Sequence, residues 1–193
     1  MGKRLKGKRV VVTHADKFMG PETVSLFREE GADVFSDTRD LTLNDACEAL
    51  IREAGIVDVL IGNFASPSFS GLSVTDLDDQ QFALPFEVMV YPLQRLARAV
   101  LPQMIDRESG KIVIYGSATA LKGMKTLAAY SAARAAQLGY VQSVGVEVAS
   151  KNIQVNLIAQ NYVESEDYYP KELMRKESFV RSLKRQVPAG RLG

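Results

Sequence analysis

Hydrophobic residues group along this chain into short unbroken runs, separated by longer segments in which they recur every three or four positions. The short runs are rich in Val and Ile, which is typical of strands buried on both faces. The longer segments have the spacing of helices with one apolar face. The expected strands span residues 9–13, 32–36, 57–61, 111–116 and 154–159.

The segments between these runs predict helices over residues 21–30, 44–54, 76–107 and 127–150. Asn44 is a plausible N-cap, and prolines at 85, 92 and 102 are expected to interrupt or kink the third segment. Strands that alternate with helices predict an α/β fold, a Rossmann-like, three-layer, doubly wound parallel sheet. We find no internal repeat or linker, so residues 1–193 are expected to form one domain.

The carboxyl ends of parallel strands meet at one edge of such a sheet, where its ligand binds. The segments expected to line this cleft are residues 13–20, 37, 63–69, 117–124 and 160–169. Asp37 is the residue that would contact a ribose in a dinucleotide fold, but we interpret it as a turn or capping residue. His14 is expected to bond to the backbone, and the acidic residues 76–79 are expected in the first turn of a helix.

Composition excludes several classes of function. The 193 residues are 46% hydrophobic, which suits a globular core, and 24 basic against 23 acidic residues leave no electrostatic footprint for nucleic acid. No apolar run approaches the roughly 18 residues of a membrane span, and the basic start lacks the features of a signal peptide. We therefore expect a cytoplasmic protein. Cys47 and His14 are the only residues of their types, so no metal site is expected.

Three residues could form a general base with an oxygen anchor. Tyr130 and Arg134 are four positions apart on an expected helix and so share one face. A guanidinium beside a phenol favours the phenolate, and Ser117 could donate to the oxygen from which Tyr130 takes a proton. Spacing alone favours a structural reading, in which Ser117 is a turn residue or cap and the other two are a packed pair.

The order of the elements, the N-F-A at residues 63–65, and Ser117 followed by Tyr130 resemble the short-chain dehydrogenase/reductase family. That family binds a dinucleotide with T-G-x-x-x-G-x-G after its first strand, whereas residues 13–20 read T-H-A-D-K-F-M-G. His14 and Phe18 replace two glycines that let the backbone approach a pyrophosphate. The family's Y-x-x-x-K is here Y-S-A-A-R, which ends at Arg134.

Both departures, together with A-Q-N-Y-V-E-S-E-D-Y-Y-P at residues 159–170, resemble the halohydrin dehalogenases, relatives without a nicotinamide. The resemblance implies that Ser117, Tyr130 and Arg134 are catalytic. The halide site that it implies consists of Phe18, Gln160, Asn161, Tyr162, Val163 and Tyr169, although some relatives have Pro in place of Gln160. The implied substrate pocket contains Pro67, Phe69, Thr119, Leu121 and Met124.

The implied activity is that of a carbon–halide lyase, which converts vicinal haloalcohols into epoxides and halide. The reverse reaction opens epoxides with halide, azide, cyanide or nitrite. The resemblance also implies no cofactor other than a bound anion, a haloalcohol or epoxide as the only small-molecule partner, and a homotetramer. The family continues beyond P-A-G-R-L-G (residues 188–193) with a helix and a strand, so either the chain is truncated relative to the family or the sheet lacks its C-terminal strand.

Two alternatives remain open at this point. One is an NAD(P)-dependent short-chain oxidoreductase with an altered phosphate loop. The other is a catalytically silent Rossmann-like subunit. NADPH binding distinguishes the first alternative, and indifference to Tyr130→Phe distinguishes the second.

Overall fold

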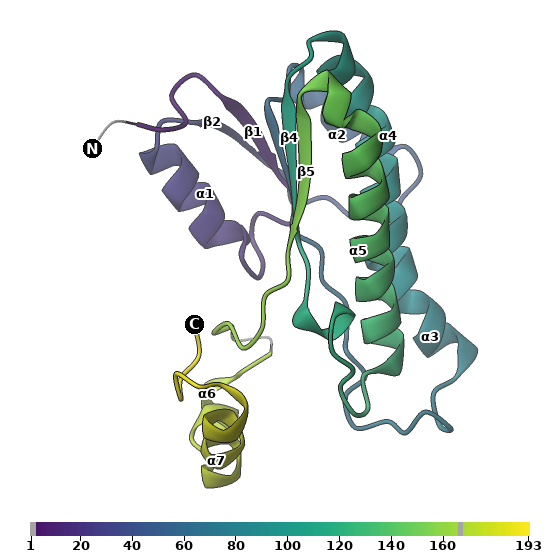
Figure 1. The fold of residues 1–193 in the computed structure, drawn as a ribbon, viewed down its shortest axis with the longest axis vertical. Coiled ribbons are helices and arrows are strands. Elements are labelled where there is room, and N and C mark those ends of the chain that lie inside the picture. The colour runs from purple at the N-terminus through teal and green to yellow at the C-terminus, as the bar shows by residue number, and fades with distance from the viewer. Residues whose placement is uncertain (1–2, 166–167) are drawn as a thin grey trace. The chain divides into compact units, whose positions relative to one another are not determined.

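The computed structural model describes residues 3–165 and 168–193 of the chain. The chain forms two compact units, Met1–Ala159 and Gln160–Gly193. The first unit contains a five-stranded parallel sheet with the strand order β2-β1-β3-β4-β5, flanked by helices (Figure 1). The predicted α/β, Rossmann-like fold is therefore confirmed.

The strands lie within two residues of the predicted ranges. They are β1 (Arg9–Val12), β2 (Asp33–Ser36), β3 (Val59–Gly62), β4 (Gly110–Tyr115) and β5 (Ile153–Ile158). β1 has β2 on one side and β3 on the other, so the strand order changes direction between β1 and β3. In open α/β sheets the ligand crevice opens at this point, beyond the carboxyl ends of the two strands. Thr13 and Asn63 occupy those two ends.

The helices of the first unit are α1 (Gly20–Glu29), α2 (Ala46–Ala54), α3 (Asp79–Pro85), α4 (Tyr91–Asp106) and α5 (Ala128–Val148). Two 3₁₀ turns, η2 (Ala118–Ala120) and η3 (Ala149–Lys151), precede and follow α5, and the π-helical turn η1 (Phe86–Val90) joins α3 to α4. The expected interruptions at Pro85 and Pro92 thus flank a widened turn, whereas α4 continues through Pro102. Proline has no N–H and its ring crowds the preceding helical turn, which accounts for the widening before Pro92.

The predicted N-cap of α2 is wrong. Asp45, not Asn44, is the N-cap; it has a left-handed backbone (φ 61°) and makes no side-chain capping bond. The acidic residues 76–79 were expected in the first turn of a helix. Asp79 does lie in the first turn of α3, and Asp78 is its N-cap. Asp78 and Gln81 exchange side-chain-to-backbone hydrogen bonds in a capping box.

Alternate residues of the strands enter two separate cores, one on each face of the sheet. Val10 and Val12 of β1 pack with Val24 of α1, whereas Val11 between them packs with α2, α4 and α5. Successive strand side chains point to opposite faces, so a continuous apolar run supplies both cores. Figure 1 shows the same division, with α1 on one side of the sheet and α2, α4 and α5 on the opposite side.

The second unit contains two helices that the sequence analysis did not predict, α6 (Lys171–Met174) and α7 (Glu177–Gln186). Three of its aromatic rings lie in series: Tyr162 stacks on Tyr169 with their centroids 5.9 Å apart, and Phe179 lies tilted against Tyr169 at 5.7 Å. The described residues that follow β5 contain no further strand.

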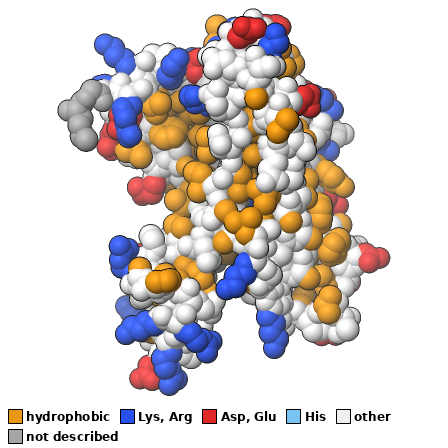
Figure 2. Space-filling model, in the orientation of Figure 1, with side chains coloured by type: hydrophobic (Ala, Val, Ile, Leu, Met, Phe, Trp, Pro, Cys, Tyr) orange, Lys and Arg blue, Asp and Glu red, His pale blue; other side chains and the backbone are white. Residues whose placement is uncertain are grey.

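On the visible face of the first unit, charged side chains of both signs are mixed with hydrophobic ones (Figure 2). Val146 of α5 is an exposed apolar residue, with 81% of its surface accessible. Within the described residues, no helix is both long and apolar enough to cross a membrane. The expectation of a cytoplasmic protein stays a prediction.

Candidate active site

Ser117 follows β4 directly and is the N-cap of the turn η2. Its Oγ accepts hydrogen bonds from the backbone N–H of Thr119 (3.2 Å) and from the hydroxyl of Thr119 (3.1 Å). Because Oγ accepts both bonds, its own proton remains available to a third group. Ser117 is therefore a turn cap, as the structural interpretation predicted. Its hydroxyl group can also donate a hydrogen bond to a further group.

Tyr130 and Arg134 lie one turn apart at the start of α5, and both are buried, with 8% and 2% of their surface exposed. The guanidinium carbon of Arg134 lies 5.1 Å from the centroid of the Tyr130 ring. The spacing predicted this contact. Tyr130 is the third residue of α5, and the partial positive charge of a helix N-terminus favours an anion there.

Neutral acceptors hold the guanidinium of Arg134. One terminal nitrogen donates to the backbone oxygen of Tyr115 (2.8 Å) and to Oε1 of Gln137 (3.0 Å), and the other donates to the backbone oxygen of Phe64 (3.0 Å). Among the described residues, Arg134 has no carboxylate partner, and its buried Nε has no acceptor. A buried positive charge without an acidic partner favours a nearby group in its anionic form.

The loop between β1 and α1 keeps a left-handed backbone at two positions without glycine. His14 has φ 44° and Phe18 has φ 49°, and this conformation costs a non-glycine residue about 1–2 kcal/mol. A Cβ on Gly20 would lie 2.4 Å from the backbone oxygen of His14 and 2.7 Å from the carbonyl carbon of Ala15. Gly20 is therefore the position at which the loop and α1 are too close for a side chain.

Asn63 fastens the same loop to the end of β3. Its side-chain nitrogen donates to the backbone oxygens of His14 (3.0 Å) and Lys17 (2.9 Å). Nδ1 of His14 lies 2.8 Å from the backbone oxygen of Asn63, and because a carbonyl only accepts, Nδ1 carries the proton. The expectation that His14 bonds to the backbone is thus confirmed.

Asp37 is 3% exposed and forms an ion pair with Nε of the half-buried Arg39. Arg39 also donates to the Glu53 carboxylate. Burial raises the pKa of the Asp37 carboxyl, although the bond from Arg39 acts in the opposite direction. The interpretation of Asp37 as a turn or capping residue missed this ion pair, which joins two residues of the same loop.

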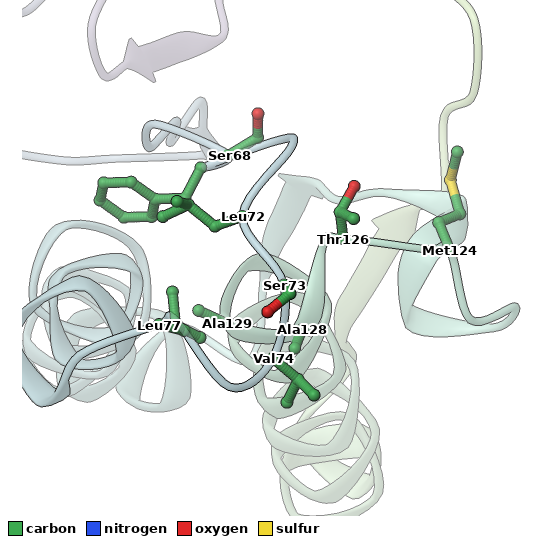
Figure 3. A pocket seen from close by; sticks show the side chains of 10 residues that line it. Ser68, Leu72, Ser73, Val74, Leu77, Met124, Thr126, Ala128 and Ala129 are labelled. Atoms are coloured by element: carbon green, nitrogen blue, oxygen red, sulfur yellow. The ribbon is translucent and has the colours of Figure 1, made fainter.

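A cavity of about 100 Å³ opens between the loop after β3 and the segment before α5 (Figure 3). Two of the five predicted pocket residues, Phe69 and Met124, line it. Pro67, Thr119 and Leu121 do not; Thr119 bonds to Ser117 instead, and Leu121 is 68% exposed. The lining residues that the sequence analysis missed are Ser68, Leu72, Ser73, Val74, Leu77, Thr126, Ala128 and Ala129.

Most of these missed residues belong to the loop after β3, whose path the sequence does not show. A sequence signal existed only for Ala128 and Ala129, which immediately precede Tyr130. They place the cavity beside the first turn of α5.

The second unit contains all the predicted halide-binding residues except Phe18. Tyr162 has a left-handed backbone (φ 52°). Within the described part of the chain, the backbone N–H groups of Tyr162 and Val163 have no hydrogen-bond partner. Successive N–H groups at such a turn form an anion-binding nest. Phe18 lies in the first unit, so the grouping of all six residues into one site stays a prediction.

The described residues contain no cluster of three His, Cys, Asp or Glu side chains that could hold a metal ion. The single cysteine, Cys47, is fully buried, and burial raises the pKa of its thiol to about 11. Cys47 is therefore a protonated core residue at neutral pH.

Comparison with known proteins identifies relatives of two kinds. The family profile described as short chain dehydrogenase matches residues 4–172. A 3-oxoacyl-[acyl-carrier-protein] reductase of Vibrio cholerae is 28% identical over an alignment that covers 98% of this chain and 85% of the reductase. By sequence, the chain is thus similar to a named reductase.

Two solved structures are similar to the chain in both fold and sequence. One, described as a dehalogenation enzyme, has a TM-score of 0.89 and 30% identity, and the match covers 98% of this chain and 86% of that one. The other is a halohydrin dehalogenase bound to ethyl (2S)-oxiran-2-ylacetate, with a TM-score of 0.85 and 25% identity over 96% of this chain and 85% of that one.

Proposed function

The chain belongs to the short chain dehydrogenase family, and we propose that within it the chain is a cofactor-independent dehalogenase of vicinal haloalcohols. In the proposed reaction a haloalcohol yields an epoxide and a halide ion, and the reverse reaction opens epoxides with halide, azide, cyanide or nitrite. The observation that carries this proposal is the buried Arg134, which lies over the Tyr130 ring and has only neutral acceptors among the described residues.

The first step is the removal of a proton from the substrate hydroxyl. Tyr130 is the proposed general base, with the guanidinium of Arg134 over its ring and its position in the first turn of α5. The phenolate oxygen takes the proton and passes it to water. Ser117 donates a hydrogen bond to the same substrate oxygen, because its Oγ accepts both of its hydrogen bonds with Thr119 and keeps its own proton for the substrate.

The second step is an intramolecular displacement. The deprotonated oxygen attacks the adjacent carbon, and the carbon–halogen bond breaks with its electron pair leaving on the halide. No hydride is transferred, so the main task of the protein is to hold oxygen, carbon and halogen in line. Phe69 and Met124 give the cavity beside α5 apolar walls for the rest of the substrate.

The leaving halide is proposed to bind to the backbone N–H groups of Tyr162 and Val163, which have no partner within the described chain. Tyr169 is the proposed wall of this site, since aromatic edges carry positive potential, and the contribution of Phe18 stays a prediction. Asn161 shapes the turn, and Gln160 precedes it. A crystal soaked in bromide tests this part, and a bromide peak away from Tyr162 and Val163 would contradict it.

Three features support a reaction without a dinucleotide. His14 and Phe18 carry side chains at two positions where the phosphate-binding loop of a dinucleotide fold has glycine. Asp37, at the position that binds a ribose, is 3% exposed, and one of its carboxylate oxygens is paired with Arg39. Arg134 is 2% exposed and bonded to strand-end carbonyls, so it is held away from a ribose hydroxyl. These residues do not fit a dinucleotide as such folds bind it.

The decisive experiment measures halide released from 1,3-dichloro-2-propanol, with and without NADPH. Wild type is expected to release chloride at the same rate in both cases, and Tyr130→Phe is expected to lose at least about 100-fold in rate, the range of a general base. Tyr140→Phe, which removes another phenol from α5, is the matched control and is expected to keep the wild-type rate. Chloride release that requires NADPH, or that survives Tyr130→Phe, would overturn the proposal.

An NADPH-dependent reductase is the second candidate, favoured by the similarity to the named reductase. It predicts saturable NADPH binding and oxidation of NADPH with a ketone substrate. A catalytically silent subunit is the third candidate, and it predicts no turnover in either assay. The two assays together assign the chain to one of the three.

We also propose a homotetramer built on helix contacts. Ala135, Gly139 and Val146 lie on the exposed face of α5, and a Cβ on Gly139 would meet no atom within 4 Å. Small exposed residues at helical spacing allow two helices to pack closely. Sedimentation of wild type as a monomer would contradict this proposal.

A further inference from the structure

Gln137 is a polar side chain with no exposed surface, on α5 one turn beyond Arg134. Both ends of its amide are used. Oε1 accepts from a terminal nitrogen of Arg134 (3.0 Å), and Nε2 donates to the backbone oxygen of Met89 (3.0 Å). The orientation of the amide follows from its partners, because a guanidinium only donates and a carbonyl only accepts.

Met89 belongs to η1, the π-helical turn before Pro92. Such turns often occur at functional sites, where an altered backbone presents a carbonyl or side chain differently from a regular helix. The hydrogen bond to the carbonyl of Met89 anchors the Gln137 side chain to η1. The bridge from Arg134 through Gln137 to Met89 thus connects α5 to η1 inside the core.

The guanidinium of Arg134 donates hydrogen bonds to three acceptors. Phe64 and Tyr115 contribute backbone oxygens from the ends of β3 and β4, and Gln137 contributes the only side-chain acceptor among the described residues. An ionised carboxylate at position 137 would neutralise the guanidinium and would face the Met89 oxygen with a second negative atom. An apolar side chain there would leave one terminal nitrogen with a single acceptor. An amide holds the guanidinium without cancelling its charge.

We infer that Gln137 is a positioning residue, which fixes the guanidinium of Arg134 over the Tyr130 ring and leaves its charge available to the phenolate. This inference rests on the proposed function for its effect on rate. The other part of the inference, that Gln137 immobilises the Arg134 side chain, does not depend on which reaction the chain catalyses.

The kinetic test uses Gln137→Met, which keeps the volume of the side chain and removes both hydrogen bonds. We expect kcat for chloride release to fall by about 10- to 100-fold, the effect of a misplaced catalytic group, with KM changed by less than about threefold. Gln103→Met is the matched control. Gln103 accepts from the backbone N–H of Val57 (2.9 Å) and donates to the backbone oxygen of Gly55 (3.0 Å), so its loss is expected to lower stability and leave kcat unchanged.

The second test does not depend on turnover. Slow rotation of an immobilised guanidinium gives separate ¹⁵Nη NMR signals, and the signals of Arg134 are identified by their loss in Arg134→Lys. We expect separate signals in wild type and Gln103→Met, and merged signals in Gln137→Met. If wild type releases no halide, the proposed function fails and this measurement alone decides the inference.

The inference is overturned if the Arg134 signals stay separate in Gln137→Met. It is also overturned if kcat of an active enzyme stays within twofold of wild type while the melting temperature falls. Should Gln137→Met not fold, Gln137→Asn replaces it under the same criteria, because its shorter amide cannot reach both partners.

Discussion

The side-chain nitrogen of Asn63 donates to the backbone oxygen of His14, while Nδ1 of His14 donates to the backbone oxygen of Asn63. The two residues thereby fasten the ends of β1 and β3 to each other, at the point where the strand order changes direction. In a sheet of this kind the crevice at that point binds the ligand. Here His14 and Asn63 join the two strand ends at that point, and His14 also lines a cavity of about 290 Å³.

Asn63→Ala removes two hydrogen bonds to loop carbonyls, those of His14 and Lys17. We expect it to lower the free energy of unfolding by about 1–3 kcal/mol, at about 0.5–1.5 kcal/mol for each lost hydrogen bond, because both carbonyls keep a backbone donor, the N–H groups of Lys17 and Gly20. Urea denaturation measures the change. Asn44→Ala, at an exposed position, is the control and is expected to change stability by less than about 0.5 kcal/mol. Equal effects of the two variants would contradict the bridging role.

Gly20→Ala places a methyl group 2.4 Å from the backbone oxygen of His14. Backbone atoms cannot move aside as a flexible side chain can, so we expect a loss of about 3 kcal/mol, the upper range for overpacking. Gly123→Ala meets no atom within 4 Å and is expected to be neutral. Thermal unfolding of the two variants checks the contrast, and a neutral Gly20→Ala would show that the loop is not closed against α1.

Arg134→Lys tests whether a charge alone is sufficient beside Tyr130. A lysine cannot donate from two separated nitrogens to Phe64, Tyr115 and Gln137, and it does not stack on a ring as a guanidinium does. We expect the rate of halide release to fall by about 100-fold or more, as for a misplaced group. Arg107→Lys is the control, since Arg107 also donates to a backbone oxygen, that of Val57 (2.8 Å). If Arg134→Lys kept the wild-type rate, the geometric part of the proposal would be wrong.

Cys47 predicts a pH dependence of stability. Burial raises the pKa of its thiol from 9.0 to about 11. The folded chain therefore holds this proton more tightly than the unfolded chain, and the resulting stability is present below pH 9 and lost as the pH rises towards 11. The loss amounts to about 3 kcal/mol, at 1.36 kcal/mol per pKa unit.

The measurement compares the free energy of unfolding of wild type and Cys47→Ala between about pH 8 and pH 11, the range that brackets the two pKa values of the thiol. Other groups that titrate in this range contribute equally to both proteins, so the difference between the two curves isolates the thiol. We expect the advantage of wild type to shrink as the pH rises. A constant difference across the range would contradict a buried thiol at this position.

The sequence by itself determined the sheet, because runs such as Val10–Val12 carry enough apolar side chains for two cores and permit only a strand covered on both faces. It also determined the pairing of Tyr130 with Arg134, since helical periodicity brings residues four apart together. Local spacing sets both features, so both could be predicted from the order of residues.

The tertiary structure decided which partners surround these residues. Two acceptors of Arg134, the backbone oxygens of Tyr115 and Phe64, come from the end of β4 and from the segment after β3. The cavity wall comes mostly from the loop after β3. Contacts of this kind depend on how loops cross the edge of the sheet, and no periodicity in the sequence records that path.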